Sequence, residues 1–155
     1  MQKFYEALFD QLQERHREIA RILDELPAEA YDWKPAPELN SMAVLIFHMT
    51  GSERYWIGDV VNREDSHRDR DAEFKVHGLS RDALKKRIED LEAYEKSVLE
   101  KMTLNQLEEE CFSPRHQKNY TVAWGLMHAL EHTAEHVGHL QLMNDLWKGK
   151  KGSQA

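Results

Sequence analysis

The chain has 155 residues, a formal net charge of −7 and one cysteine, Cys111, so an intramolecular disulfide and a cysteine-rich zinc site are excluded. The acidic charge argues against binding to nucleic acid or to anionic membranes, because both need a basic surface, and no stretch approaches the ~20 apolar residues of a membrane span. The first ten residues carry charges where a signal peptide needs an apolar run, and we therefore expect a cytoplasmic protein with a single domain over residues 1–155.

The first predicted helix covers residues 2–26. Its apolar side chains recur at steps of three and four residues, as on the side of a helix that faces a core: Tyr5, Leu8, Leu12, Ile19, Ile22 and Leu26. Pro27 ends this helix. Residues 27–40 contain two aromatic side chains, Tyr31 and Trp33, between prolines, and we expect an ordered connection that packs against the helices.

The second predicted helix covers residues 41–60, with Ser41 as a capping residue. It is apolar over more than half of its circumference, which indicates a heavily buried helix. His48 lies in its middle. Tyr55 and Asp59 fall in the same angular sector as His48, toward the end of the helix.

Residues 60–79 form a polar, highly charged connection, which we expect to be a solvated loop. Its length exceeds the usual ~2–8 residues between bundle helices, so the connection is expected to cross the bundle lengthwise and to join two parallel helices. The third predicted helix covers residues 81–102. A short helix is expected at 103–110, and residues 111–120 are expected to be irregular.

The last predicted helix covers residues 121–147 and ends before Gly149. Since the chain shows no strand pattern of useful length, we predict an all-α fold, a four-helix bundle. Besides its histidines, the last helix has a second side made of small or apolar residues: Ala123, Met127, Ala134 and Gly138. That is more apolar surface than one side of a bundle requires, and it predicts a homodimer.

Four histidines follow one face of this last helix at steps of four, four and three residues: His128, His132, His136 and His139. Buried imidazoles must be hydrogen-bonded or bound to a metal, because a buried polar group without a partner is costly. His132 and His136 can hold one metal ion from the same side. A further ligand must come from a neighbouring helix, and His48 is the candidate.

Three neutral imidazoles leave coordination positions open, as in reactive metal sites. Nitrogen donors suit Zn²⁺ or Ni²⁺, with Fe²⁺ as a third option. His128 and His139 either support the ligands, contact the substrate or only pack. Four further histidines lie in exposed-looking or irregular contexts and receive no role: His16, His67, His77 and His116.

Two other kinds of metal site are less consistent with the sequence. His132-Thr-Ala-Glu135-His136 matches the H-x-x-E-H motif of inverted zinc proteases, but those enzymes need a distant third ligand and a cleft lined by strands. Ferritin-like di-iron sites need Glu-x-x-His pairs on two helices. The one such match, Glu64 to His67, lies in the charged connection.

Three motifs in order carry a resemblance to a known family: Trp33-Lys-Pro-Ala-Pro-Glu-Leu-Asn-Ser41, then His48, then His132-x-x-x-His136-x-Gly138. Together they resemble the DinB-like (YfiT-like) metalloenzymes over essentially the whole chain. The resemblance implies a bundle of up-down-down-up order, a divalent metal on His48, His132 and His136, and frequent homodimers. Some relatives transfer or isomerise substrates with low-molecular-weight thiols such as bacillithiol or mycothiol. This chain has His136-Val-Gly-His139 where a common pattern is His-Arg-Gly-Gln, which leaves a shared substrate open.

We therefore predict a metal-dependent enzyme that acts on a small molecule, of the thiol S-transferase or hydrolase type. A bound ion lowers the pKa of a thiol or of water and holds it for attack. No catalytic side chain is assigned; Tyr55 and Asp59 are candidates to line the pocket, and Cys111 is as well explained by packing. One alternative is a non-catalytic metal-binding or small-molecule-binding bundle with a stress or regulatory role. Another is a purely structural bundle whose histidines only form hydrogen bonds.

Overall fold

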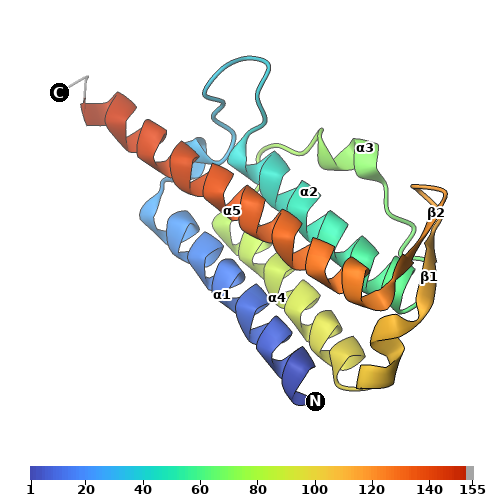
Figure 1. Cartoon of the computed structure of the whole chain (residues 1–155). Coiled ribbons are helices and arrows are strands. Elements are labelled where there is room, and N and C mark those ends of the chain that lie inside the picture. The colour runs from blue at the N-terminus through green and yellow to red at the C-terminus, as the bar shows by residue number, and fades with distance from the viewer. Residues whose placement is uncertain (153–155) are drawn as a thin grey trace.

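The computed structural model describes residues 1–152, in which four long helices pack side by side (Figure 1). The long helices are α1 (Lys3–Glu25), α2 (Met42–Arg54), α4 (Arg81–Leu99) and α5 (Val122–Gly152). The shorter elements are two 3-10 turns (Ala28–Ala30 and Leu104–Glu108), the helix α3 (Arg70–Glu73), and the strands β1 (Glu110–Ser113) and β2 (Lys118–Thr121). Residues 153–155 of the predicted domain lie outside the described residues.

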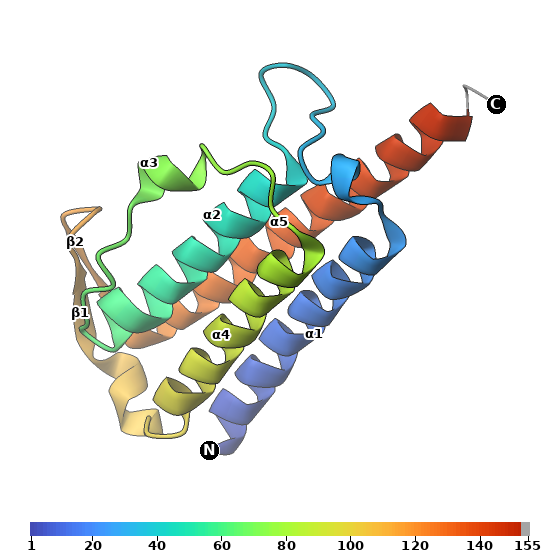
Figure 2. The ribbon, with the colours of Figure 1, turned by 180° about the vertical axis from the view of Figure 1, so that it is seen from behind.

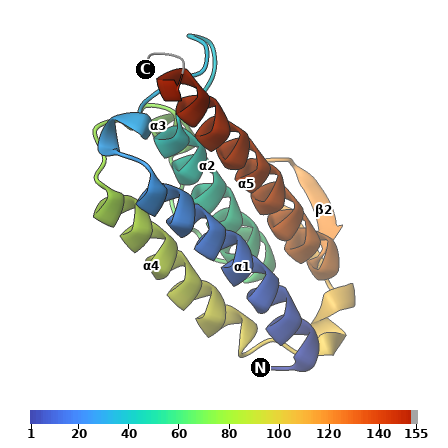
Figure 3. The ribbon, with the colours of Figure 1, turned by 90° about the vertical axis from the view of Figure 1, so that its left-hand side faces the viewer.

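The helices have the predicted up-down-down-up order. α1 and α5 run in one direction and α2 and α4 in the other, so α2 and α4 are parallel (Figures 1 and 2). The connection between them returns along the outside of α2 and carries α3 on its way, as expected from its length (Figure 2). α1 and α2 each pack against both α4 and α5, which places α1 and α2 at opposite corners of the bundle (Figure 3).

α2 begins at Ser41, whose hydroxyl accepts a hydrogen bond from the backbone N–H of Val44 at 3.3 Å. Most of its side chains are buried, as its apolar circumference predicted. The helix continues without a break as a π-helical segment over Tyr55–Val61. Wider turns of this kind are often found near functional sites, because they change the angular position of the side chains that follow.

Residues 111–120 are not irregular, as we expected, but contain an antiparallel hairpin in which Cys111 lies opposite Tyr120. Each strand has four residues, and buried and exposed side chains alternate only in β1. Such short strands are too brief to give a recognisable period-two pattern. The prediction that the chain contains no strand is therefore wrong for this segment, although the fold remains a helical bundle.

Two other segments differ from the expected ones: the connection 60–79 and the end of the last helix. The connection 60–79 contains α3, which begins at Asp69, whose carboxylate accepts the N–H of Ala72 at 3.0 Å. α5 continues through Gly149 to Gly152. A glycine ends a helix when it takes the left-handed conformation, and among the described glycines this conformation occurs at Gly78 but not at Gly149.

The core consists of two separate clusters of buried apolar residues, one toward each end of the bundle. One includes Ile19 of α1 and Met49 of α2, and the other includes Leu12 of α1 and Ile57 of α2. Within residues 1–152, no helix has the length and apolar character needed to cross a membrane.

Candidate metal centre

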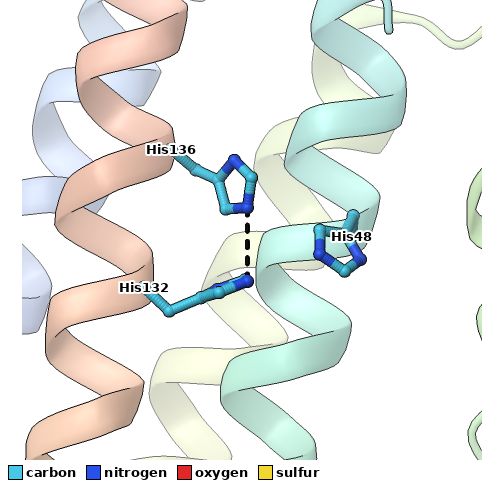
Figure 4. A group of neighbouring side chains, drawn as sticks. All are labelled: His48, His132 and His136. Atoms are coloured by element: carbon cyan, nitrogen blue, oxygen red, sulfur yellow. Dashed lines mark hydrogen bonds between the residues drawn. The ribbon is translucent and has the colours of Figure 1, made fainter.

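The three histidines singled out by the sequence lie together between α2 and α5. His132 and His136 project from consecutive turns of α5 toward α2, where His48 lies (Figure 4). Their candidate ligand atoms are all within 4.8 Å of one another. The Nε2 atoms of His132 and His136 are 3.2 Å apart. The geometry of the side chains therefore agrees with the expected cluster, while the binding of a metal by them stays a prediction.

The donor atoms of this cluster suit a divalent ion. Metal–nitrogen bonds of ~2.1 Å at tetrahedral or octahedral angles place neighbouring donors roughly 3.0–3.4 Å apart. The 3.2 Å between the two Nε2 atoms of α5 falls in this range. Burial, reinforced by the charges of neighbouring histidines, lowers the pKa of His132 to about 3 and that of His136 to about 4. Both rings are thus neutral at pH 7, the state in which imidazole binds metals.

A carboxylate and an arginine orient His48. Its Nδ1–H donates to Oε2 of Glu73 at 3.1 Å, and Arg68 donates to both oxygens of the same carboxylate, at 2.6 and 2.8 Å. Burial alone would raise the pKa of Glu73, but the hydrogen bonds from Arg68 and then from His48 outweigh it, and the pKa is lowered. With Nδ1 occupied, Nε2 of His48 is the nitrogen left for a metal. This carboxylate–histidine arrangement is typical of metal ligands.

Glu73 is a residue of the candidate centre that the sequence did not reveal. It lies on α3, inside the connection that we expected to be a solvated loop, and it is nevertheless buried. Its carboxylate approaches α2 at Gly51, where a Cβ atom would collide with Glu73. The sequence offered two separate signals: Gly51 within α2, and Asp69 as a capping residue for a short helix in the connection. Only the fold shows that Gly51 and this short helix are in contact.

The other two histidines of the stripe differ in position. His128 stacks on Trp124 with ring centroids 4.8 Å apart, meets Trp56 edge-on, and its centroid is 6.0 Å from that of His132. It therefore belongs to an aromatic cluster beside the three histidines. His139 is exposed, and its Nδ1 lies 3.5 Å from Nδ1 of His136, where it can support that ring.

A mainly apolar cavity of about 310 Å³ ends on this centre. Two of the histidines, His136 and His139, contribute to its lining. The other lining residues are Pro35, Leu39, Asn40, Leu45, Leu142, Met143 and Leu146. A volume of this size is at the lower end of small-ligand pockets. The arrangement suits a small molecule with an apolar part that reaches the face of His136.

Tyr55 and Asp59 do not line this cavity, contrary to our expectation. They line a different one of about 370 Å³, whose described lining includes Arg68 but none of the three clustered histidines. Tyr55 shares a 2.6 Å hydrogen bond with the hydroxyl of Ser113, and Asp59 accepts hydrogen bonds from Ser66. The π-helical turn that begins at Tyr55 is one reason why a regular 100° spacing misplaced them.

The side chains of two further residues are poorly suited to catalysis at this centre. Cys111 is buried, and its thiol donates to the carbonyl of Tyr120 at 3.4 Å. Burial raises the pKa of this thiol, so it is a weak nucleophile. Glu135, the base that a protease of the H-x-x-E-H type would need, is exposed.

Three solved structures with the same fold are relevant to the candidate centre. YjoA, a DinB-like protein from Bacillus subtilis, has a TM-score of 0.71 and 18% identity, over 92% of each chain. YfiT from Bacillus subtilis, described as a probable metal-dependent hydrolase with an unusual four-helix bundle topology, has a TM-score of 0.73 and 13% identity, over 96% of this chain and 90% of YfiT. A mutant of a mycothiol-dependent maleylpyruvate isomerase has a TM-score of 0.67 and 13% identity, over 90% of this chain and 63% of the isomerase.

The bundle has the fold of the DinB-like protein YjoA and of YfiT, in agreement with the resemblance read from its motifs. The sequence profile of the mycothiol-S-transferase family matches residues 7–149, and the chain belongs to this family. No curated protein matches the chain.

Proposed function

We propose that the chain is a divalent-metal-dependent enzyme that joins a low-molecular-weight thiol to a small electrophile. The observation that carries the proposal is the convergence of three imidazoles from only two helices, with the pKa values of His132 and His136 lowered so that these two rings are neutral at pH 7. Among the described residues, this group offers three protein donors, fewer than the four to six that divalent ions take. An exogenous group can therefore complete the coordination.

The name of the family and the names of two structural relatives support the same chemistry. The family is described by mycothiol S-transfer, one relative is a mycothiol-dependent isomerase, and another is described as a probable metal-dependent hydrolase. A divalent ion on His48, His132 and His136, Zn²⁺ or Ni²⁺ before Fe²⁺, would supply the positive charge that deprotonates a thiol at neutral pH.

The chain's own residues orient the metal ligands and bind the substrate. Glu73 and Arg68 hold the ring of His48 through its Nδ1, which leaves Nε2 as the nitrogen available to a metal. The apolar cavity beside His136 accommodates the apolar part of the electrophile and excludes water from it. Since Cys111 is a buried, weak nucleophile, the sulfur that reacts comes from a cosubstrate.

The test uses protein purified without a histidine tag. Its metal content is measured first, and metal-loaded protein is then offered monochlorobimane together with mycothiol, bacillithiol, glutathione or cysteine in turn. We expect the wild type to consume one of these thiols and the His48→Ala variant to lose both the metal and the activity. His77→Ala, which removes an exposed histidine, is the matched control and should behave as the wild type.

The other outcomes separate the remaining functions. Hydrolysis of ester or amide substrates without thiol consumption would make the protein a hydrolase of the kind that YfiT is described as. Metal binding with no turnover of either kind would instead support a non-catalytic binding protein. A wild type that binds no metal would refute the proposal altogether.

A further inference from the structure

A second group of ionisable side chains lies in the middle of the bundle, where each of the four long helices contributes one polar residue. They are His16 of α1, Glu53 of α2, Glu95 of α4 and Thr133 of α5, and all four are buried. On α1 and α2 this layer separates the two apolar core clusters: His16 follows Leu12 and precedes Ile19. His16, which we expected to be exposed, is 1% exposed.

Three of these side chains direct donor atoms at one point. Nε2 of His16 lies 3.1 Å from Oε1 of Glu53. One donor atom each from His16, Glu53 and Glu95 lies within 4.8 Å of the other two. A separation of 3.1 Å is what neighbouring ligands show around an ion with bonds of ~2.1 Å.

The orientation of His16 parallels that of His48. Nδ1 of His16 lies 3.0 Å from a carboxylate oxygen of Glu92, as Nδ1 of His48 lies 3.1 Å from one of Glu73. With Nδ1–H donating to Glu92, His16 would direct the lone pair of Nε2 at the cluster once Nε2 gives up its proton. The hydroxyl of Thr133 donates to Oε2 of Glu53 and so orients that carboxylate as well. Such supporting hydrogen bonds are typical of metal ligands.

Four buried atoms at this point make no regular hydrogen bond among the described residues, although Nε2 of His16 and Oε1 of Glu53 face each other as an ion pair at 3.1 Å. They are Nε2 of His16, Oε1 of Glu53, and both carboxylate oxygens of Glu95. Buried polar atoms are almost always paired, and a buried carboxylate needs a cation. Two carboxylates and an imidazole nitrogen lie close together here, and one divalent ion that replaces their protons would pair with all three residues.

We propose that His16, Glu53 and Glu95 form a second divalent-metal site, independent of the three-histidine centre. One imidazole nitrogen with two carboxylates is a harder donor set than three imidazoles, and it suits Mn²⁺ or Fe²⁺. Thr133 and Glu92 are positioning residues that hold two of the ligands. The site ties three of the four helices together at mid-length, so its ion stabilises the fold.

Protons are the competing occupants of the cluster. Burial by itself lowers the pKa of His16, but the charge and hydrogen bond of Glu53, and then Glu92, outweigh it and raise the pKa to about 9. Burial and the charge of Glu53 raise the pKa of Glu95. In metal-free protein His16 therefore carries a proton at pH 7, and Glu95 holds its proton more strongly than an ordinary carboxyl group. The experiment has to distinguish an ion from these protons.

The experiment counts metal ions per chain in tag-free protein refolded from denaturant with excess Mn²⁺ and then desalted. Because the three-histidine centre binds Mn²⁺ less well than Zn²⁺, one equivalent of Zn²⁺ is added afterwards. We expect two ions per chain in the wild type and, in the His132→Ala variant, one Mn²⁺ with a bound electron paramagnetic resonance signal. We expect Glu95→Gln to lose this Mn²⁺ and to keep the zinc. Glu89→Gln, an exposed change on the same helix, should keep both ions.

The outcomes distinguish this site from the proposed enzyme centre. If Glu95→Gln does not fold, the His132→Ala variant alone tests the second site. One ion retained by this variant supports the second site, and the absence of any bound ion refutes it. A wild type with a single ion that disappears entirely in His132→Ala would show that the core cluster holds protons instead. That result would not contradict the proposed thiol transferase. Conversely, a wild type that binds Mn²⁺ but no zinc would contradict the three-histidine centre and not the second site.

Discussion

His48 depends on a single carboxylate for its orientation. Glu73 accepts the Nδ1–H of His48 and is itself held by two hydrogen bonds from Arg68. Replacing this carboxylate with an amide, as in Glu73→Gln, keeps the shape of the side chain but removes its charge. We expect the affinity of the three-histidine centre for Zn²⁺ to fall roughly 10–100-fold, as in other sites that lose a supporting carboxylate.

Competition with a chromophoric chelator measures this loss. Asp71→Asn is the matched control, since Asp71 lies on the same short helix and is exposed. Equal zinc affinities for Glu73→Gln and the wild type would show that His48 does not need its carboxylate.

The titration of His16 should appear in the stability of metal-free protein. The folded-state pKa of His16 is raised to about 9, above its ordinary value of 6.5. A raised pKa means that the ion pairs of His16 stabilise the fold fully below pH ~6.5 and that this contribution is lost as the pH rises through about 9. We expect the urea midpoint of chelator-treated protein to decline over this range.

The His16→Gln variant isolates this contribution. It should be less stable than the wild type at pH 6 and should decline less between pH 6.5 and 9. His77→Ala, an exposed histidine, serves as the control and should follow the wild type. Parallel curves for His16→Gln and the wild type would contradict a charged His16 in the core.

At the scale of elements, α2 and α3 meet through a glycine. A Cβ at Gly51 would collide with the carboxylate of Glu73 and lie 3.2 Å from Nε of Arg68. Alanine is the better helix former by ~1 kcal/mol, yet overpacking a tight contact costs about 1–3 kcal/mol. We expect Gly51→Ala to be destabilised, and to lose zinc affinity because Glu73 is displaced from His48.

Urea unfolding and zinc titration of the same variant test both effects. In the matched control Gly149→Ala on α5, a Cβ would meet no atom within 4 Å, so stability should be unchanged or slightly higher. A Gly51→Ala variant with wild-type stability and affinity would show that α3 adjusts its position without cost.

At the scale of the whole molecule, α5 leaves a large part of its apolar surface uncovered. Met127 is 64% exposed and Trp124 42%, and of the small residues in the predicted dimer face, Ala134 and Gly138 are exposed while Ala123 is half-buried. Contiguous apolar surface of this kind marks a contact site. We therefore expect a homodimer with twice the 18.3 kDa mass of the chain.

Light scattering at micromolar concentration tests the assembly. Met127→Glu should shift the protein toward 18.3 kDa, because a charge would be buried in the contact. Leu104→Glu places the same charge at another exposed apolar residue, outside α5, and should leave the mass unchanged. A wild type of 18.3 kDa would refute the dimer.

By itself the sequence determined the helices of the bundle, their order and the three clustered histidines. Apolar side chains at steps of three and four residues define the buried side of a helix, and a histidine pair four residues apart lies on one side of α5 whatever surrounds it. The length of the connection between α2 and α4 was enough to indicate that these helices run in parallel.

Only the tertiary structure decided which polar residues meet. His16 occupies a core position in the spacing of α1, between Leu12 and Ile19, but the spacing of one helix cannot tell that Glu53 and Glu95 face it from two others. Glu73 lies in a charged connection without periodicity, so the contact that orients His48 left no pattern to read. Periodicity reports the side of an element that is buried, whereas the partner on the facing element depends on how the helices are placed, and that is a property of the packed bundle.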